Sequence, residues 1–167
     1  MSKLILVCAE KNSGKTTALW NLHKQFKTGR ISRQGGFITL LNQEGDKSRI
    51  VLKELLTGDE MLLASSREED WTGKDVNTFK MGQQYIFSQN LFDYCNAAYT
   101  NSLDCSHLFI DEAGALELRG GGFAPAIEFL STNYEGTLCI AVREPFLEDF
   151  KMLYPFERGW TTQTLTI

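Results

Sequence analysis

No stretch of this sequence concentrates positive charge. The chain has 167 residues, with 17 lysines and arginines against 21 aspartates and glutamates, for a formal net charge of −4. Binding to nucleic acid without regard to base sequence needs clustered Lys and Arg side chains against the phosphates. We therefore expect no nucleic-acid partner.

Metal-binding and disulfide patterns are also missing. None of the four cysteines forms a C-x-x-C pair with another, and only two histidines could supply imidazole ligands. In a sequence, zinc sites and disulfide frameworks are indicated by closely or regularly spaced Cys and His residues. The sequence therefore predicts neither a zinc site nor a disulfide framework.

Long apolar runs are absent. The first run, residues 4–7, follows only Met1-Ser2-Lys3 and is too short for a signal peptide or a membrane span. We expect no membrane partner and a cytoplasmic location. Hydrophobic residues make up 43% and charged residues 23% of the chain, which is typical of a globular protein. The length predicts a single domain over residues 1–167.

A phosphate-binding loop follows the first apolar run. The P-loop pattern is G-x-x-x-x-G-K-[ST], in which backbone N–H groups surround the phosphates, the lysine reaches the β and γ oxygens, and the hydroxyl binds Mg²⁺. These roles fall to Gly14, Lys15 and Thr16. The candidate nucleotide-binding residues are Ala9, Glu10, Lys11, Asn12, Ser13, Gly14, Lys15, Thr16 and Thr17.

Two loop positions depart from the usual pattern. Ala9 replaces the first glycine, and its methyl group is tolerated if its φ stays negative. Asn12 stands where many such loops carry glycine, and Asn is the residue that best tolerates positive φ after glycine. We expect a negative φ at Ala9 and a positive φ at Asn12.

The context of the loop distinguishes a P-loop from a chance Gly-Lys-Thr in a strand-to-helix turn. A strand is predicted before it, and apolar residues recur at helical spacing from Leu19 to Phe26, with Thr28-Gly29 as a stop. A strand before and a helix after are what the P-loop requires. The context favours the phosphate-binding interpretation.

Asp111 and Glu112 end a second apolar strand, predicted over residues 106–112. An acid at the carboxyl end of a strand beside the P-loop strand can hold Mg²⁺ through water, the Walker B role. A second acid next to it can polarise a water for attack on the γ-phosphorus. Asp111 is the metal candidate together with Thr16, and Glu112 is the candidate base. The alternative is that the two acids only mark the end of a strand.

The remaining pattern predicts alternating strands and helices. Because the spacer between residues 49–52 and 61–64 cannot hold a helix, these strands are expected as antiparallel additions. Residues 65–75 are expected to form a solvated loop, and residues 42–46 a turn. The other predicted strands cover residues 35–41, 79–87 with a break at Gly82, 138–142 and 161–167, and the other helices start near 88 or cover 124–131 and 146–153.

The two motifs resemble those of a family of small P-loop nucleoside-triphosphatases first described from thermophiles, a group that includes a cancer-related human nucleoside-triphosphatase. Residues 9–17 resemble its G-E-P-G-x-G-K-T-T, and residues 110–114 resemble its I-D-E-I-G. Weaker similarities occur at Gly36-Phe37 and Glu117-Leu118. The family's E-x-R is not found around residues 39–42, and Leu116 replaces the Met of its K-M-E-L.

This resemblance implies a three-layer α/β sandwich of the RecA-like (ASCE) P-loop kind, with a mostly parallel sheet and antiparallel additions. It places Lys15 and Asp111 on neighbouring crests at the carboxyl ends of the strands. It also implies Mg²⁺-dependent hydrolysis of ATP, GTP and related triphosphates to diphosphate and phosphate, with little base selectivity. Lys15 and Glu112 would be the catalytic residues and Mg²⁺ the cofactor.

Two arginines and two other function classes stay open. Arg119 and Arg143 could stabilise charge on the transferring phosphoryl group, or they are surface guanidiniums. A small-molecule phosphotransferase is disfavoured because its lid is usually Arg-rich, and residues 119–123 hold one Arg. A nucleotide-dependent switch would use residues 45–75 as its partner surface, but the retention of Lys15 and Glu112 favours an enzyme. The sequence leaves any protein partner unknown.

Overall fold

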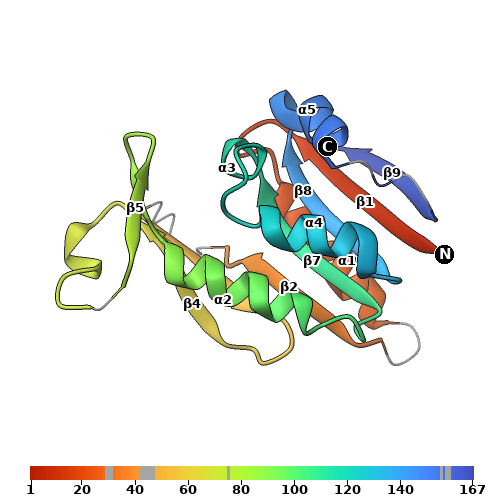
Figure 1. Ribbon diagram of the computed structural model, residues 1–167, viewed down its shortest axis with the longest axis horizontal. Coiled ribbons are helices and arrows are strands. Elements are labelled where there is room, and N and C mark those ends of the chain that lie inside the picture. The colour runs from red at the N-terminus through yellow and green to blue at the C-terminus, as the bar shows by residue number, and fades with distance from the viewer. Residues whose placement is uncertain (29–31, 42–47, 75, 155, 157–158) are drawn as a thin grey trace.

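The computed structural model describes residues 1–28, 32–41, 48–74, 76–154, 156 and 159–167, and it contains a nine-stranded sheet with helices on both faces (Figure 1). The strands are β1 Ser2–Ala9, β2 Gln34–Thr39, β3 Arg49–Glu54, β4 Glu60–Ser65, β5 Thr78–Met81, β6 Tyr85–Ser88, β7 His107–Ala113, β8 Thr137–Arg143 and β9 Trp160–Thr166. The helices are α1 Lys15–Lys27, α2 Gln89–Thr100, α3 Ala115–Leu118, α4 Ala124–Asn133 and α5 Leu147–Leu153, with 3₁₀ turns η1 Glu68–Asp70 and η2 Glu144–Phe146.

The sheet has a parallel half and an antiparallel half. Its order is β5-β6-β4-β3-β2-β7-β8-β1-β9. The five strands from β2 to β9 in this order pair in parallel, whereas β3, β4, β6 and β5 join as antiparallel strands. This arrangement confirms the predicted α/β sheet with antiparallel additions.

The strand that ends in the acid pair is not the direct neighbour of the P-loop strand. β8 lies between β1 and β7, so the expectation that these two strands lie side by side is wrong by one strand. The reason is that β8 is as apolar as its neighbours and is buried over residues 138–142. A strand buried on both faces is suited to the middle of a parallel sheet.

Side chains along each strand point alternately to the two faces of the sheet, and this divides the core into two layers. In β1, Leu4 and Leu6 belong to the core cluster that lies beneath α2 and α4, while Ile5 and Val7 pack with α1 on the opposite face. Successive side chains of a strand point to opposite faces, so an apolar run buried on both sides needs a helix layer on each. The result is the predicted three-layer sandwich, with α2 and α4 on the near face in Figure 1.

The strands and loops between residues 65 and 88 follow the sequence in part. Residues 79–87 form the β5–β6 hairpin, and Ser88 caps α2 by accepting a hydrogen bond from the Leu91 N–H at 3.1 Å. The expectation of a solvated loop over residues 65–75 is wrong in part, because the side chain of Asp70 is only 9% exposed and is paired with Arg49. The predicted turn at 42–46 lies outside the described residues. No described helix is both long and apolar enough to cross a membrane.

Candidate active site

The loop after β1 has the backbone conformation that its sequence predicts. Asn12 has φ 61° and Gly14 has φ 93°, and Ala9 is not among the residues with positive φ. The positive φ values at Asn12 and Gly14 turn the chain back so that α1 can begin at Lys15. The expectations for Ala9 and Asn12 are therefore both confirmed.

The N-terminus of α1 carries no neutralising group of its own within the described residues. Gly14 offers no side-chain cap, and the first turn contains no acidic residue. The first N–H groups of a helix lack intrahelical partners and carry partial positive charge, which favours an anion. Lys15 adds a full positive charge at the same end, and its buried side chain donates from Nζ to the Glu10 carbonyl at 2.8 Å.

Asp111 points toward the first turn of α1. Phe109, two residues earlier in β7, packs on the α1 face, and the pleat of the strand directs Asp111 to the same side. Its carboxylate accepts from the Thr16 hydroxyl at 3.0 and 3.3 Å and from the Thr39 N–H at 2.9 Å. The structure thus brings together Thr16 and Asp111, the two residues predicted to bind the metal.

Burial leaves the charge of Asp111 incompletely compensated. The residue is 5% exposed, and this desolvation raises its pKa to about 6, although the hydrogen bonds from Thr39 and Thr16 act in the opposite direction. Buried carboxylates in proteins are normally paired with a cation or bound to a metal. A cation beside Asp111 would provide that compensation.

Glu112 leaves the plane of the sheet at a bulge. The register of β7 with β8 shifts between Ile110 and Ala113, and Glu112 has φ 74°. A bulge places an extra residue on one strand and re-aims its side chain. Glu112 is consequently exposed, whereas Asp111 next to it is buried. The two acids therefore point in different directions, as their separate predicted roles require.

The two candidate arginines differ in position. Arg143 ends β8, the strand between β1 and β7, and lies opposite Ala9 in the register with β1. Its guanidinium stacks over Phe146 at 5.5 Å, and its Nε is buried without a hydrogen-bond partner in the described part of the chain. Arg119 is exposed at the C-terminal end of α3. The position of Arg143 thus favours a site role more than that of Arg119.

Thr39 at the end of β2 and Trp20 of α1 join the site without having been predicted from the sequence. The backbone N–H of Thr39 donates to Asp111, and the Thr39 carbonyl accepts from the indole Nε1 of Trp20 at 2.9 Å. Trp20 belongs to α1, so Thr39 connects this helix to the buried acid. The available signal was the end of a third parallel strand at the same edge of the sheet.

Glu117 organises the chain that follows the acid pair. Its side chain accepts from the N–H groups of Gly114 at 2.8 Å and Phe123 at 3.2 Å, and its carbonyl accepts from the Tyr154 hydroxyl. A Cβ on Gly122 would lie 2.2 Å from Glu117 Oε1. Burial raises the pKa of Glu117 to about 7. From the sequence, Glu117 was identified only as part of the similarity to the family, with no structural role.

Cys8, Tyr154 and Trp160 pack within the fold. Cys8 is a buried apolar residue of β1. Tyr154 is buried, and the half-buried Trp160 donates from Nε1 to the Ser131 carbonyl at 2.9 Å. Lys11 is exposed in the loop.

The donor atoms near Asp111 fit a hard divalent cation. They are carboxylate and hydroxyl oxygens from Asp111 and Thr16, and the described residues contain no group of three or more His, Cys, Asp or Glu that could enclose a metal. Mg²⁺ prefers oxygen ligands and is usually held by one or two protein groups together with waters and substrate phosphates. Thr16 and Asp111 are therefore suited to Mg²⁺ in the presence of a nucleotide.

The site consists of a strand, a loop with two positive φ values and a helix with an uncapped N-terminus. A buried acid at the carboxyl end of a second strand lies opposite. Together these features define a P-loop nucleotide-binding protein of the α/β class. A family model described as NTPase matches residues 4–162. The chain therefore belongs to the NTPase family and is a nucleoside-triphosphate phosphohydrolase.

Two solved structures share the fold. The crystal structure of THEP1 from the hyperthermophile Aquifex aeolicus has a TM-score of 0.66 and 17% sequence identity, with 98% of this chain and 90% of that chain covered. The solution structure of a human cancer-related nucleoside triphosphatase has a TM-score of 0.68 and 19% identity, with 98% and 89% covered. No curated protein sequence matches the chain.

Proposed function

We propose that this chain is an Mg²⁺-dependent nucleoside-triphosphatase that hydrolyses ATP, GTP and related triphosphates to the diphosphate and phosphate. The observation that carries this proposal is the contact between Thr16 and Asp111 beside the uncapped N-terminus of α1. It joins a hydroxyl and a carboxylate, both ligands suited to Mg²⁺, to an anion-binding helix end. The cytoplasm stays the expected location.

In this proposal the loop and α1 bind the triphosphate. The N–H groups of residues 12–17 surround the phosphates, and Lys15 exchanges its bond to the Glu10 carbonyl for the β and γ oxygens. Thr16 and Asp111 would hold Mg²⁺, and the bound ion would supply positive charge beside those oxygens. Because Thr16, Asp111 and the N-terminus of α1 lie together before the substrate arrives, the change of partner by Lys15 is the main rearrangement that binding requires.

Glu112 is proposed as the general base. Its exposed carboxylate accepts a proton from a water molecule as the water oxygen bonds to the γ-phosphorus. The bond between the γ-phosphorus and the bridging oxygen breaks, so that the nucleoside diphosphate leaves with the electron pair and the phosphoryl group becomes inorganic phosphate. The bulge in β7 supports this role because it separates the direction of Glu112 from that of Asp111.

Arg143 is proposed to stabilise charge on the transferring phosphoryl group. It ends the strand between the P-loop strand and the acid strand, and its buried Nε has no partner in the described chain. We expect Arg143→Lys to slow single-turnover phosphate release by about ten-fold or more, with nucleotide affinity nearly unchanged. Arg119→Lys is the matched control, and equal rates in the two variants would remove the distinction between these arginines.

Phosphate release from a panel of triphosphates tests the reaction. The purified protein is incubated with ATP, GTP, CTP or UTP and Mg²⁺, with no phosphoryl acceptor, and free phosphate is followed over time. We expect release with several of the nucleotides and none after chelation of Mg²⁺. Tight nucleotide binding without release would instead favour a phosphotransferase or a nucleotide-dependent switch.

A further inference from the structure

Strands β2 and β7 stop pairing before either strand ends. Their parallel register ends with Phe37 opposite Ile110, and residues 38–39 of β2 and 111–113 of β7 lie beyond it. We call these residues of the two strands the β2–β7 seam. The seam lies at the carboxyl ends of two parallel strands, the edge at which open α/β sheets bind their ligands.

Side chains join the two strands at the seam. Where the seam begins, the Tyr99 hydroxyl accepts from the Phe37 N–H at 3.3 Å and donates to the Phe109 carbonyl at 2.6 Å. Where β2 ends, the Thr39 N–H donates to Oδ2 of Asp111 at 2.9 Å. The position of β2 relative to β7 at the seam therefore depends on these side chains.

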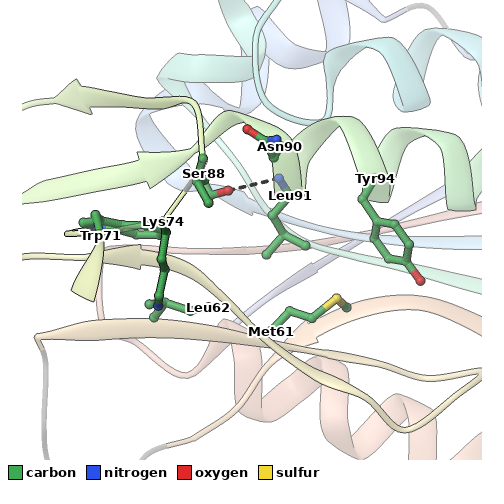
Figure 2. A pocket seen from close by; sticks show the side chains of 9 residues that line it. Met61, Leu62, Trp71, Lys74, Ser88, Asn90, Leu91 and Tyr94 are labelled. Carbon is green, nitrogen blue, oxygen red and sulfur yellow. Dashed lines mark hydrogen bonds between the residues drawn. The ribbon is translucent and has the colours of Figure 1, made fainter.

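Tyr99 comes from α2, and this helix is attached at two other points. Ser88 caps its start by accepting from the Leu91 N–H, the bond drawn in Figure 2. Tyr94, which lines a pocket of about 330 Å³ together with these two residues, donates from its hydroxyl to Glu54 Oε2 at 2.8 Å. The α2 side of the seam is therefore held by contacts outside the nucleotide site.

On the opposite face of the sheet, one turn of α1 closes a ring of contacts around Asp111. The Thr16 hydroxyl donates to Asp111 at 3.0 Å, and Trp20 donates from Nε1 to the Thr39 carbonyl at 2.9 Å. Because Thr16 and Trp20 stand at positions i and i+4 of the helix, both lie on the same face of it. The Thr39 N–H completes the ring at Asp111. The same helix thus holds the acid directly through Thr16 and indirectly through Trp20.

The indole of Trp20 is itself fixed by its neighbours. The half-buried ring packs against the core cluster on the α1 face. It meets the ring of His23 edge-on, with the ring centroids 5.6 Å apart. His23 is buried and is hydrogen-bonded to the side chain of Gln34 in β2. The indole N–H therefore has a defined position from which it reaches Thr39.

Asp111 depends on this support because its carboxylate is buried. Only 5% of the residue is exposed, so water does not readily replace a lost hydrogen bond. Groups that hydrogen-bond a metal ligand orient it, and their removal commonly lowers metal affinity. The Thr39 N–H fixes the rotation of the carboxylate, and Trp20 fixes Thr39.

We propose that Trp20 is a positioning residue of the Mg²⁺ site. Through the Thr39 carbonyl it holds the end of β2, and the Thr39 N–H in turn orients the Asp111 carboxylate for the ion. Trp20 touches neither the ion nor the nucleotide in this role, so it sets the Mg²⁺ requirement and not the chemical step. The inference rests on the proposed function, in which Thr16 and Asp111 hold the ion.

Trp20→Phe tests this role, with Trp160→Phe as the matched control. Both substitutions keep a ring and remove an indole N–H that donates to a backbone carbonyl at 2.9 Å. Trp160, however, pairs with Ser2 at the end of β1 that is remote from the loop. Binding of a fluorescent nucleotide is titrated at several Mg²⁺ concentrations.

We expect Trp20→Phe to raise the Mg²⁺ concentration at half-maximal nucleotide binding about three- to ten-fold. Nucleotide affinity at saturating Mg²⁺ should stay within about two-fold of the parent, because the loop and α1 are unchanged. A general loss of stability would not produce this separation. Trp160→Phe should behave as the parent does.

A double-mutant cycle without metal tests the coupling itself. Urea unfolding in the presence of a chelator is measured for Trp20→Phe, Asp111→Ala and the double variant. We expect the effects on the unfolding equilibrium constant to depart from a simple product by about three-fold or more. In the control cycle of Trp160→Phe with Asp111→Ala, the effects should multiply to within about two-fold.

The outcomes distinguish this role from the proposed function. An equal Mg²⁺ requirement in Trp20→Phe and Trp160→Phe, or a cycle without coupling, would overturn the positioning role and leave the proposed hydrolysis intact. Nucleotide binding by the parent that does not depend on Mg²⁺ would overturn both. If Trp20→Phe is unfolded by circular dichroism, the Trp20 indole N–H is followed in the parent by ¹⁵N NMR. Its resonance should shift when Mg²⁺ is added to the nucleotide complex, and an unchanged resonance would overturn the role.

Discussion

The hydroxyl of Thr16 donates a hydrogen bond of 3.0 Å to Oδ2 of Asp111, across 95 positions of the chain. This contact joins the first turn of α1 to the end of β7, although β8 separates the P-loop strand from β7. The anion-binding helix end and the buried acid are therefore assembled before any ligand arrives.

Replacement of the loop cation and the loop hydroxyl should have different effects. Lys15→Ala removes a charge-assisted bond to phosphate and should weaken nucleotide binding about ten- to one-hundred-fold. Thr16→Ala removes a metal ligand and should raise the Mg²⁺ concentration needed for binding. Titration of a fluorescent nucleotide at several Mg²⁺ concentrations measures both, with Lys24→Ala, an exposed lysine in the last turn of α1, as control. Unchanged affinity and metal dependence in both variants would overturn the P-loop assignment.

The positive φ of Asn12 can be tested by two substitutions. At φ 61° glycine is free of strain, whereas a β-branched residue is a steric outlier. Asn12→Gly should bind nucleotide as the parent does, and Asn12→Val should bind about five-fold more weakly or worse, or destabilise the loop. Calorimetric titration with a nonhydrolysable triphosphate gives the comparison. Equal affinities in the two variants would show that the loop does not depend on this backbone conformation.

The two acids of β7 should separate chemistry from binding. Glu112→Gln keeps the shape of the side chain but removes the base, so the chemical step should fall about 10²- to 10⁴-fold with nearly unchanged nucleotide affinity. Asp111→Asn should lose Mg²⁺-dependent binding as well as rate. Single-turnover phosphate release and equilibrium affinity are measured for both. A Glu112→Gln protein within a few-fold of the parent rate would leave Glu112 without a catalytic role.

Glu117 should make the stability of the protein depend on pH. Burial raises its pKa from 4.5 to about 7, so the folded protein retains a proton that the unfolded chain loses. Its contribution to the free energy of unfolding is fully present below pH 4.5 and is lost as the pH rises through 7. Between pH 5 and pH 8 the loss should be on the order of 2 kcal/mol.

Urea unfolding of the parent and of Glu117→Gln at the two pH values measures this loss. The amide does not titrate, so the variant should lack this part of the pH dependence whatever its absolute stability. Glu128→Gln, at an exposed position of α4 away from the acid pair, serves as the control for the loss of a carboxylate. Parallel pH profiles for the parent and Glu117→Gln would show that Glu117 does not titrate in this range.

Local patterns predicted most of the elements because each is encoded over a few residues. The apolar run before the loop, the helical spacing after it and the Ser88 cap all act within one or two turns of chain. The conformation of Asn12 was predictable for the same reason, since the residue itself tolerates positive φ. The resemblance to a known family then gave the arrangement of these elements, which local patterns do not contain.

The remaining features depend on contacts between distant segments. The apolar strands β7 and β8 have similar compositions, so nothing local shows that β8 inserts beside β1. The role of Thr39 depends on the register of β2 with β7, which brings its N–H to Asp111. The direction of Glu112 depends on a bulge relative to β8. Such features follow from the assembled sheet and could not be read from the residues alone.

The pairing of β1 has a consequence for the order of events during protein synthesis. Both neighbours of this strand come from late in the chain: Lys3 pairs with Thr137 of β8, and Ser2 pairs with Trp160 of β9. The ribosome therefore makes the apolar strand of the P-loop long before its partners exist. Contacts between distant segments are slow to form, and unpaired strands are prone to aggregation. The nascent chain has to keep this strand from misassociating until the residues of β8 emerge, so the nucleotide site is completed only late in synthesis.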